Sequence, residues 1–160
     1  MAARPIAPVS RLLGRAGLLL ACASLAACHK HVERNWSAGT PRYQGEISRL
    51  DGREEGVWTF WFPNGQMREQ GRFEHGLRVG RWRQWHANGV ARCEGERTPA
   101  PDGSASLRTG YWRFWYESGE LEGQGSFVAG EREGHWDYHL TDGKLDGDRS
   151  GEYHLDQRLL

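Results

Sequence analysis

The sequence predicts an all-β protein that is built from tandem β-hairpins. A Gly-x-Trp motif recurs at nearly regular intervals over residues 56–155, and a polar-Gly pair of the kind that closes a hairpin follows each copy. No stretch after residue 28 shows the apolar periodicity of a sustained helix. The composition agrees, because 22 glycines and 8 tryptophans in 160 residues supply turns and aromatic strands rather than a thick aliphatic core.

Four repeat units are recognisable from their glycines and tryptophans. They span 56–79, 80–109, 110–133 and 134–155, so consecutive units begin 24, 30 and 24 residues apart. The extra residues of the second unit fall around 98–104, where Pro, Gly, Asp and Ser predict a loop. The positions that define the repeat are Gly56, Trp58, Gly65, Gly80, Trp82, Gly89, Gly110, Trp112, Gly119, Gly134, Trp136 and Gly143.

Each unit is predicted to form one hairpin with two unlike faces. In the first unit, 57–62 is the outgoing strand, 64–65 the turn and 66–70 the returning strand. Because strand side chains alternate between faces, Trp58 and Phe60 share a densely aromatic face. The opposite face carries a lone aromatic residue in each of the first three units, in a row made of Trp61, Trp85 and Trp115, and His139 takes this position in the fourth. A hairpin cannot bury such rings alone, so neighbouring units must stack.

These residues resemble the MORN repeat, in the variant form common in bacteria. The resemblance rests on Gly-x-Trp, an aromatic three residues later, a polar-Gly turn and a later Gly-x-aromatic such as 71–73, and it covers 56–155. It implies hairpins laid side by side in one elongated, curved, single-layer antiparallel sheet. Weaker remnants predict a tether and a degenerate opening repeat over 28–55, which includes Trp36, and a tail at 156–160.

The N-terminal segment has the features of a secretory signal. Residues 1–15 carry three arginines and no acid, and a short apolar run follows them. Residues 25–28, Leu-Ala-Ala-Cys, resemble the bacterial lipobox, which implies a lipoprotein signal peptide at 1–27 and lipidation of Cys28. Because His29 rather than an aspartate follows, the resemblance favours an outer-membrane protein facing the periplasm if the source has two membranes. A buried N-terminal helix is the structural alternative.

The charge balance argues against nucleic acid as a partner. The chain carries 21 basic and 21 acidic side chains. Removal of a leader that holds three of the arginines would leave a mildly acidic protein, without the basic footprint that nucleic acid requires.

No residue pattern predicts catalysis, a cofactor or a metal. The sequence contains no CxxC, HExxH or Gly-x-Ser-x-Gly motif. His135 and His139 would lie about 13 Å apart along a strand, which is too far to share one metal. Cys93 is expected to be a small strand residue rather than a redox centre. The strand acids expected to face solvent or each other, rather than to form a general acid/base pair, are Glu69, Glu94 and Glu122.

Binding is the function that remains. We expect a non-enzymatic, lipid-anchored cell-envelope protein whose repeats form a scaffold for an unidentified envelope protein, through the aromatic face or the tryptophan row. A purely structural role is favoured for Trp58, Trp82, Trp112 and Trp136. The alternatives are a module that binds cell-wall glycan or phospholipid, and an inhibitor resembling the YwqK-type antitoxins that sequesters a partner protein. The sequence shows no basic patch of the kind that anionic lipid requires.

Overall fold

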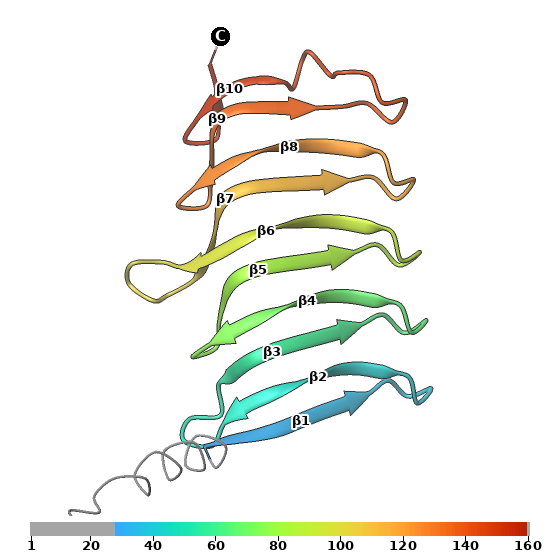
Figure 1. Cartoon of the computed structure of the whole chain (residues 1–160), viewed down its shortest axis with the longest axis vertical. Coiled ribbons are helices and arrows are strands. Elements are labelled where there is room, and N and C mark those ends of the chain that lie inside the picture. Colours follow the sequence, from blue (N-terminus) through green and yellow to red (C-terminus); the bar gives the residue numbers. More distant parts are fainter. Residues whose placement is uncertain (1–27, 160) are drawn as a thin grey trace, which may run out of the picture.

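The computed structural model describes residues 28–159, so the signal peptide predicted at 1–27 lies outside the described residues. Within that range the regular elements are strands, and their order in the sheet follows their order in the chain (Figure 1). They are β1 (His29–Asn35), β2 (Pro41–Ser48), β3 (Glu54–Trp61), β4 (Met67–Glu74), β5 (Leu77–Trp85), β6 (Ala91–Pro99), β7 (Ser106–Trp115), β8 (Leu121–Val128), β9 (Glu131–Tyr138), β10 (Gly151–His154) and β11 (Gln157–Arg158).

Every strand pairs antiparallel with the next one along the chain. Figure 1 shows the hairpins side by side along the long axis of one sheet, with no second layer over the described strands. The prediction of an all-β fold, with tandem hairpins in one open, curved sheet, is therefore confirmed. In residues 28–159 the structure has no helix that is long and apolar enough to span a membrane.

The polar-Gly turns close the hairpins through one shared geometry. Between β3 and β4, the Phe62 N–H donates to the Gln66 carbonyl at 2.8 Å and the Gly65 N–H donates to the Phe62 carbonyl at 3.0 Å. Gly65 has a φ of 83°, a conformation that glycine adopts without the clash of a Cβ. Asn64 Oδ1 accepts a further bond from the Gln66 N–H at 3.1 Å. The same two backbone bonds recur at residues 36–40, 86–90, 116–120 and 140–144.

The first glycine of each unit marks a break in strand pairing. Gly80, for example, has a φ of 62° and lies where the pairing of β4 with β5 shifts register. Such a bulge bends the strand and increases its twist. The equivalent glycines, also with positive φ next to a register shift, are Gly56, Gly110 and Gly134.

The two ends of the array also contribute strands to the sheet. Residues 29–48, expected to be a tether and a degenerate repeat, form the complete β1–β2 hairpin, in which Val32 and Ile47 pack against the aromatic core. The tail also enters the sheet, because Gln157 of β11 pairs with His154 of β10. Both segments lack the Gly-x-Trp signature and contribute few apolar side chains, so the sequence predicted them only as a degenerate opening repeat and a tail.

The core is a series of aromatic rings on one face of the sheet. Its tryptophans are between 1% and 5% exposed, and they are Trp58, Trp82, Trp112 and Trp136. Their indoles lie over glycines of the preceding strand, namely Gly45, Gly71, Gly95 and Gly125, where a Cβ would overlap the ring. Phe73 meets Trp82 edge-on with ring centroids 5.1 Å apart. In the Gly-x-aromatic motif the glycine therefore makes room for a ring, and the aromatic residue packs against it.

Polar side chains divide this aromatic core at the second unit. One cluster contains Trp58, Phe73 and Trp82. The other contains Cys93, Trp112, Phe127, Trp136, Tyr138 and Tyr153. Between them, Gln84 and Arg97 occupy positions that hold aromatics in the first and third units. The face is consequently polar at its centre and apolar on either side.

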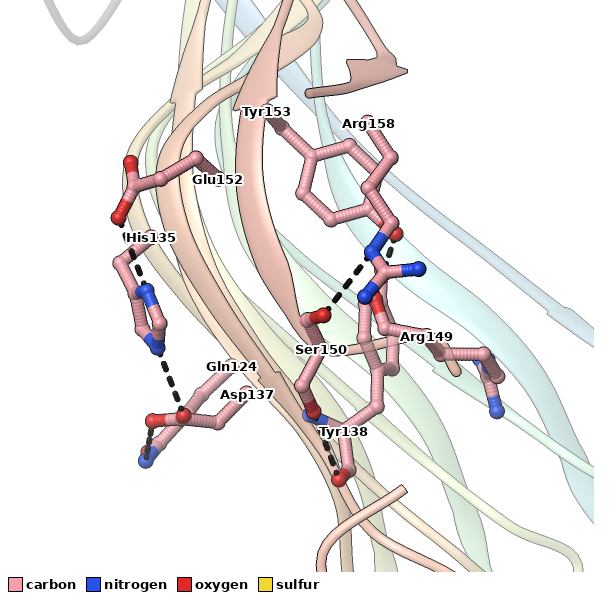
Figure 2. Close-up of polar contacts among 9 residues, drawn as sticks. All are labelled: Gln124, His135, Asp137, Tyr138, Arg149, Ser150, Glu152, Tyr153 and Arg158. Atoms are coloured by element: carbon pink, nitrogen blue, oxygen red, sulfur yellow. Dashed lines mark hydrogen bonds and ion pairs between the residues drawn. The ribbon is translucent and has the colours of Figure 1, made fainter. Parts of the chain in front are cut away.

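The C-terminal end is fixed by hydrogen bonds rather than by a full hairpin (Figure 2). Ser150 Oγ accepts a bond from the Tyr138 N–H at 2.8 Å, and the Arg158 Nε–H donates to the Ser150 carbonyl at 3.0 Å. The Tyr153 hydroxyl donates to the Arg149 carbonyl at 2.6 Å. These bonds hold β10 against β9 where the irregular segment 139–150 replaces a returning strand.

Candidate binding surfaces

The predicted tryptophan row lies on the side of the sheet that carries the polar-Gly turns (right in Figure 1). Trp61, Trp85 and Trp115 are the last residues of β3, β5 and β7, and each follows a register shift directly. All three are half-buried. Trp36, just after β1, extends the row, because its Nε1–H donates to the Trp61 carbonyl at 3.3 Å. Sequence reasoning had assigned Trp36 to the opening repeat and not to this row.

The row belongs to the face opposite the aromatic core, which we call the outer face and which carries Arg83, Glu94 and Arg113. These three residues pair across β5, β6 and β7. The Arg113 guanidinium lies 5.8 Å from the centre of the Trp115 ring. Trp115 thus faces away from its neighbour Trp112, which is buried in the core.

A groove of about 310 Å³ separates Trp85 from Trp115. Its other lining residues are Arg83, Gln84, Ala91, Cys93 and Glu94. Within residues 28–159, the indole N–H groups of Trp61, Trp85 and Trp115 donate no hydrogen bond. In the core, the Trp112 Nε1–H donates to the Glu96 carbonyl at 3.1 Å, whereas the Trp82 Nε1–H is buried and has no partner among the described residues. The groove therefore offers apolar rings together with unused donors.

Glu94 is held by three arginines on the outer face and is not a freely solvated acid, which corrects the sequence expectation. Its carboxylate lies 2.8 Å from Arg81, 3.3 Å from Arg83 and 3.1 Å from Arg113. Partial burial works to raise the pKa of Glu94, but the three guanidiniums outweigh it and the pKa is lowered. This network fixes the strands that form the floor of the groove.

Glu69 also differs from the sequence expectation of a solvated acid, because it is buried on the core face with 7% exposure. Its carboxylate accepts bonds from Arg78 at 3.1 Å, from Arg68 at 3.4 Å and from Gln84 at 3.2 Å. A buried carboxylate is tolerated only when it is paired and hydrogen-bonded in this way. The third acid, Glu122, is partly exposed and lies 3.7 Å from Arg149.

Cys93 is 4% exposed, and its thiol donates to Gln84 Oε1 at 3.3 Å. Burial raises the pKa of this thiol, which disfavours the reactive thiolate. Cys28 is exposed and directly precedes β1. Among residues 28–159, no group of three or more His, Cys, Asp or Glu side chains could hold a metal ion.

The family model of the MORN repeat variant matches residues 54–75 and 108–129. The chain carries MORN-variant repeats. No curated protein matches the chain significantly.

The two matched MORN-variant repeats are the β3–β4 and β7–β8 hairpins, which retain the full set of aromatic residues. In the unmatched β5–β6 hairpin, Gln84 and Arg97 replace two of the rings. The fourth unit, which the family model does not match, keeps its tryptophan, but the returning strand is reduced to a bridge between His139 and Leu145. The spacing of the glycines and tryptophans thus continues through units whose other aromatic positions have changed.

Proposed function

We propose that this chain is a non-catalytic MORN-variant scaffold that binds a protein of the cell envelope through its tryptophan row. The observation that carries this proposal is the groove between Trp85 and Trp115, with indole donors that no residue in 28–159 uses. Tryptophan supplies a large rigid contact area at low conformational entropy cost, and its N–H can bond a partner at the same time.

The repeat architecture supports a macromolecular rather than a small ligand. Trp61, Trp85 and Trp115 lie two strands apart in turn, which is about 9.6 Å per step. A ligand that contacts all three must therefore extend along the sheet for about 20 Å, as a protein surface does. The Glu94 network lies beside the row and holds its strands rigid, which lowers the ordering cost of binding.

We also propose that lipid on Cys28 holds the scaffold at the membrane. The edge strand β1 begins at His29, one residue after Cys28. The Cys28 carbonyl accepts a bond from the Arg49 N–H at 2.8 Å, so this residue is tied to the sheet. A lipid at this position would leave no flexible spacer between the membrane and β1, whose outer backbone groups are unpaired within residues 28–159.

Site-specific crosslinking in the source cells tests the binding surface. A photo-crosslinking amino acid at position 85 is expected to capture one protein reproducibly. The same amino acid in place of Tyr111, which is 54% exposed on β7, is the matched control and should not capture it. Replacing Trp61, Trp85 and Trp115 together by alanine should abolish capture from neighbouring groove positions such as Ala91.

Retention of the same partner by the triple alanine variant would refute the assignment to the tryptophan row. Crosslinks to glycan or to lipid instead of protein would favour the alternative of a glycan- or phospholipid-binding module. A captured protein that regains a toxic activity when released would favour the antitoxin-like alternative.

The anchor has a separate test. Cys28→Ser should abolish incorporation of a labelled fatty acid and release the protein from the membrane fraction. Cys93→Ser is the matched control and should leave both unchanged, because Cys93 is buried in the sheet. Membrane retention of the Cys28→Ser protein would contradict the proposed anchor.

A further inference from the structure

The core face also carries a row of arginines that the sequence reasoning did not identify. Each lies two residues before the first glycine of a unit and stacks on an aromatic ring. Their guanidinium carbons lie 4.5 Å from the Trp82 ring for Arg78, 5.0 Å from the Trp112 ring for Arg108, and 4.3 Å from the Tyr153 ring for Arg132. The structure thus gathers a basic stripe on one face of a chain without net charge.

The first and last arginines of this row each form an ion pair with a carboxylate, and the middle one forms none within residues 28–159. Arg78 lies 3.1 Å from Glu69, and Arg132 lies 2.8 Å from Asp156. Within residues 28–159, the Arg108 side chain makes ring contacts but neither a hydrogen bond nor an ion pair. Arg78 and Arg132 thus each stack on a ring and pair with a carboxylate, whereas Arg108 stacks on a ring without an ion pair.

A second arginine adds electrostatic repulsion at Arg108, because no carboxylate pairs with Arg108 to offset it. Arg97 pairs directly across from Arg108, and its side chain bonds the Ser106 carbonyl at 3.2 Å. Burial, followed by the charges of Arg78 and Arg108, lowers the pKa of Arg97. Like charges directly opposite each other destabilise a sheet, so an anion placed here would relieve repulsion as well as bond Arg108.

The repeat itself explains why the carboxylate is absent. Asp156 stands in the β10–β11 turn, where its N–H donates to the Arg132 carbonyl at 3.2 Å. In the equivalent β8–β9 turn, the Gly130 N–H donates to the Arg108 carbonyl at 3.0 Å. Both residues have positive φ, at 62° and 94°. Gly130 therefore occupies the position of Asp156 without its carboxylate.

The space beside Gly130 is a hollow of about 360 Å³. Arg108 forms part of its wall, and Phe114, Phe127 and Trp136 contribute aromatic surface. The wall also holds two carboxylates, because Asp156 pairs with Arg132 and Glu122 lies near Arg149. The charge of Arg108 acts on Asp156 as well, but the two side chains form no ion pair. The hollow can thus accept an acidic side chain with an apolar neighbour, and Arg108 is the cation that is available to it.

We propose that Arg108 binds a carboxylate of an acidic segment of a partner protein, in the hollow that Gly130 leaves open. The proposal rests on the proposed function only in taking the carboxylate from a protein, and it places this contact on the face opposite the tryptophan row. A second surface of this kind would allow the sheet to be held from both sides.

A carboxylate introduced at position 130 by substitution tests the geometry of the site. Gly130→Asp should supply the missing carboxylate, as Asp156 does for Arg132, and should raise the melting temperature above that of the isosteric Gly130→Asn. The difference between these two variants should vanish in an Arg108→Gln background. An equal difference in both backgrounds would overturn the assignment of a carboxylate site to Arg108.

Titration of the full-length protein tests the external ligand. The probe is the peptide acetyl-Phe-Glu-Phe-amide, followed through the Arg108 Nε–Hε resonance. We expect a saturable shift that is at least tenfold weaker with the Phe-Gln-Phe peptide and with the Gly130→Asp protein. The absence of any shift, or equal binding of both peptides, would overturn the proposal.

Two further ligands distinguish the sources of the anion. Tighter binding of glutarate than of the acidic peptide would overturn the assignment to a partner protein, and tighter binding of inorganic phosphate would overturn the choice of a carboxylate. The Trp61, Trp85 and Trp115 triple alanine variant should bind the peptide unchanged, since its substitutions lie on the other face. A failure at Arg108 is thereby separable from a failure of the tryptophan row.

Discussion

The Cα of Gly71 lies directly beneath the Trp82 indole, so a Cβ on Gly71 would overlap the ring carbons. The same relationship joins Gly95 to Trp112 in the next unit. Each tryptophan thus covers the strand before it, and this contact ties one hairpin to its neighbour. The regular spacing between the Gly-x-aromatic and Gly-x-Trp motifs in the sequence reflects this contact.

Gly71→Ala is expected to destabilise the sheet by about 3 kcal/mol, because the added methyl group must displace a buried indole that is packed on both sides. The measurement is the free energy of unfolding in urea, followed by tryptophan fluorescence. Gly147→Ala is the control, since nothing lies within 4 Å of a Cβ at Gly147. That variant should stay within about 0.5 kcal/mol of the wild type. Equal effects of the two substitutions would contradict the close packing of Gly71 under Trp82.

Trp82→Ala should mainly lower stability, whereas Trp85→Ala, only three residues away, should mainly weaken partner binding. Trp82 is 1% exposed, so its truncation should cost about 3–5 kcal/mol of unfolding free energy through cavity formation. Trp85 is half-buried beside the groove, and its truncation should cost less than half as much while it weakens partner binding. Urea denaturation and crosslinking yield check the two parts. Loss of binding by a folded Trp85→Ala protein separates recognition from stability.

Glu69→Gln should destabilise the protein by about 1–3 kcal/mol, because it leaves the partly buried Arg78 guanidinium without its counter-charge. Glu74→Gln on the same strand is the control. Glu74 pairs with Arg72 where both side chains are more than half exposed, and such pairs contribute little. Thermal unfolding of both variants measures the contrast, which would be absent if Glu69 were a solvated strand acid.

His135 should make the stability depend on pH near neutrality. Its ring bonds Glu152 at 2.9 Å and Asp137 at 3.2 Å on the outer face, as Figure 2 shows. The bond to Glu152, with Asp137 contributing, raises the pKa of His135 above its ordinary value of 6.5. A raised pKa in the folded state means that the stabilisation is complete below pH 6.5 and is lost as the pH rises through the folded-state pKa.

The check is a series of melting temperatures measured from below pH 6.5 upward. The wild-type melting temperature should fall across this window by more than that of His135→Gln, which cannot gain the charge. Identical slopes for the two proteins would rule out the ion pairs of His135 as the source of the pH dependence.

The hairpins could be predicted from the sequence because their signals are local. Asn64-Gly65 demands a turn, and the alternation of Trp58 with Trp61 assigns the two faces. The β1–β2 hairpin was predicted only as a degenerate opening repeat, because Val32 and Ile47 gain their apolar environment from neighbouring strands and no local motif indicates that contact. The solvated role expected of Glu69 was wrong for the same reason, since its partner Arg78 lies on the neighbouring strand.

The sequence by itself determined the repeat, the turn positions and the division of tryptophans between two faces, because each depends on residues close together in the chain. The tertiary structure alone decided which charges meet. Arg97 and Arg108 oppose each other because β6 pairs with β7, and Gly130 leaves Arg108 without a carboxylate because two turns of the array differ by one side chain. Electrostatic partners on a sheet are set by strand register, and register depends on contacts between strands that no local pattern specifies.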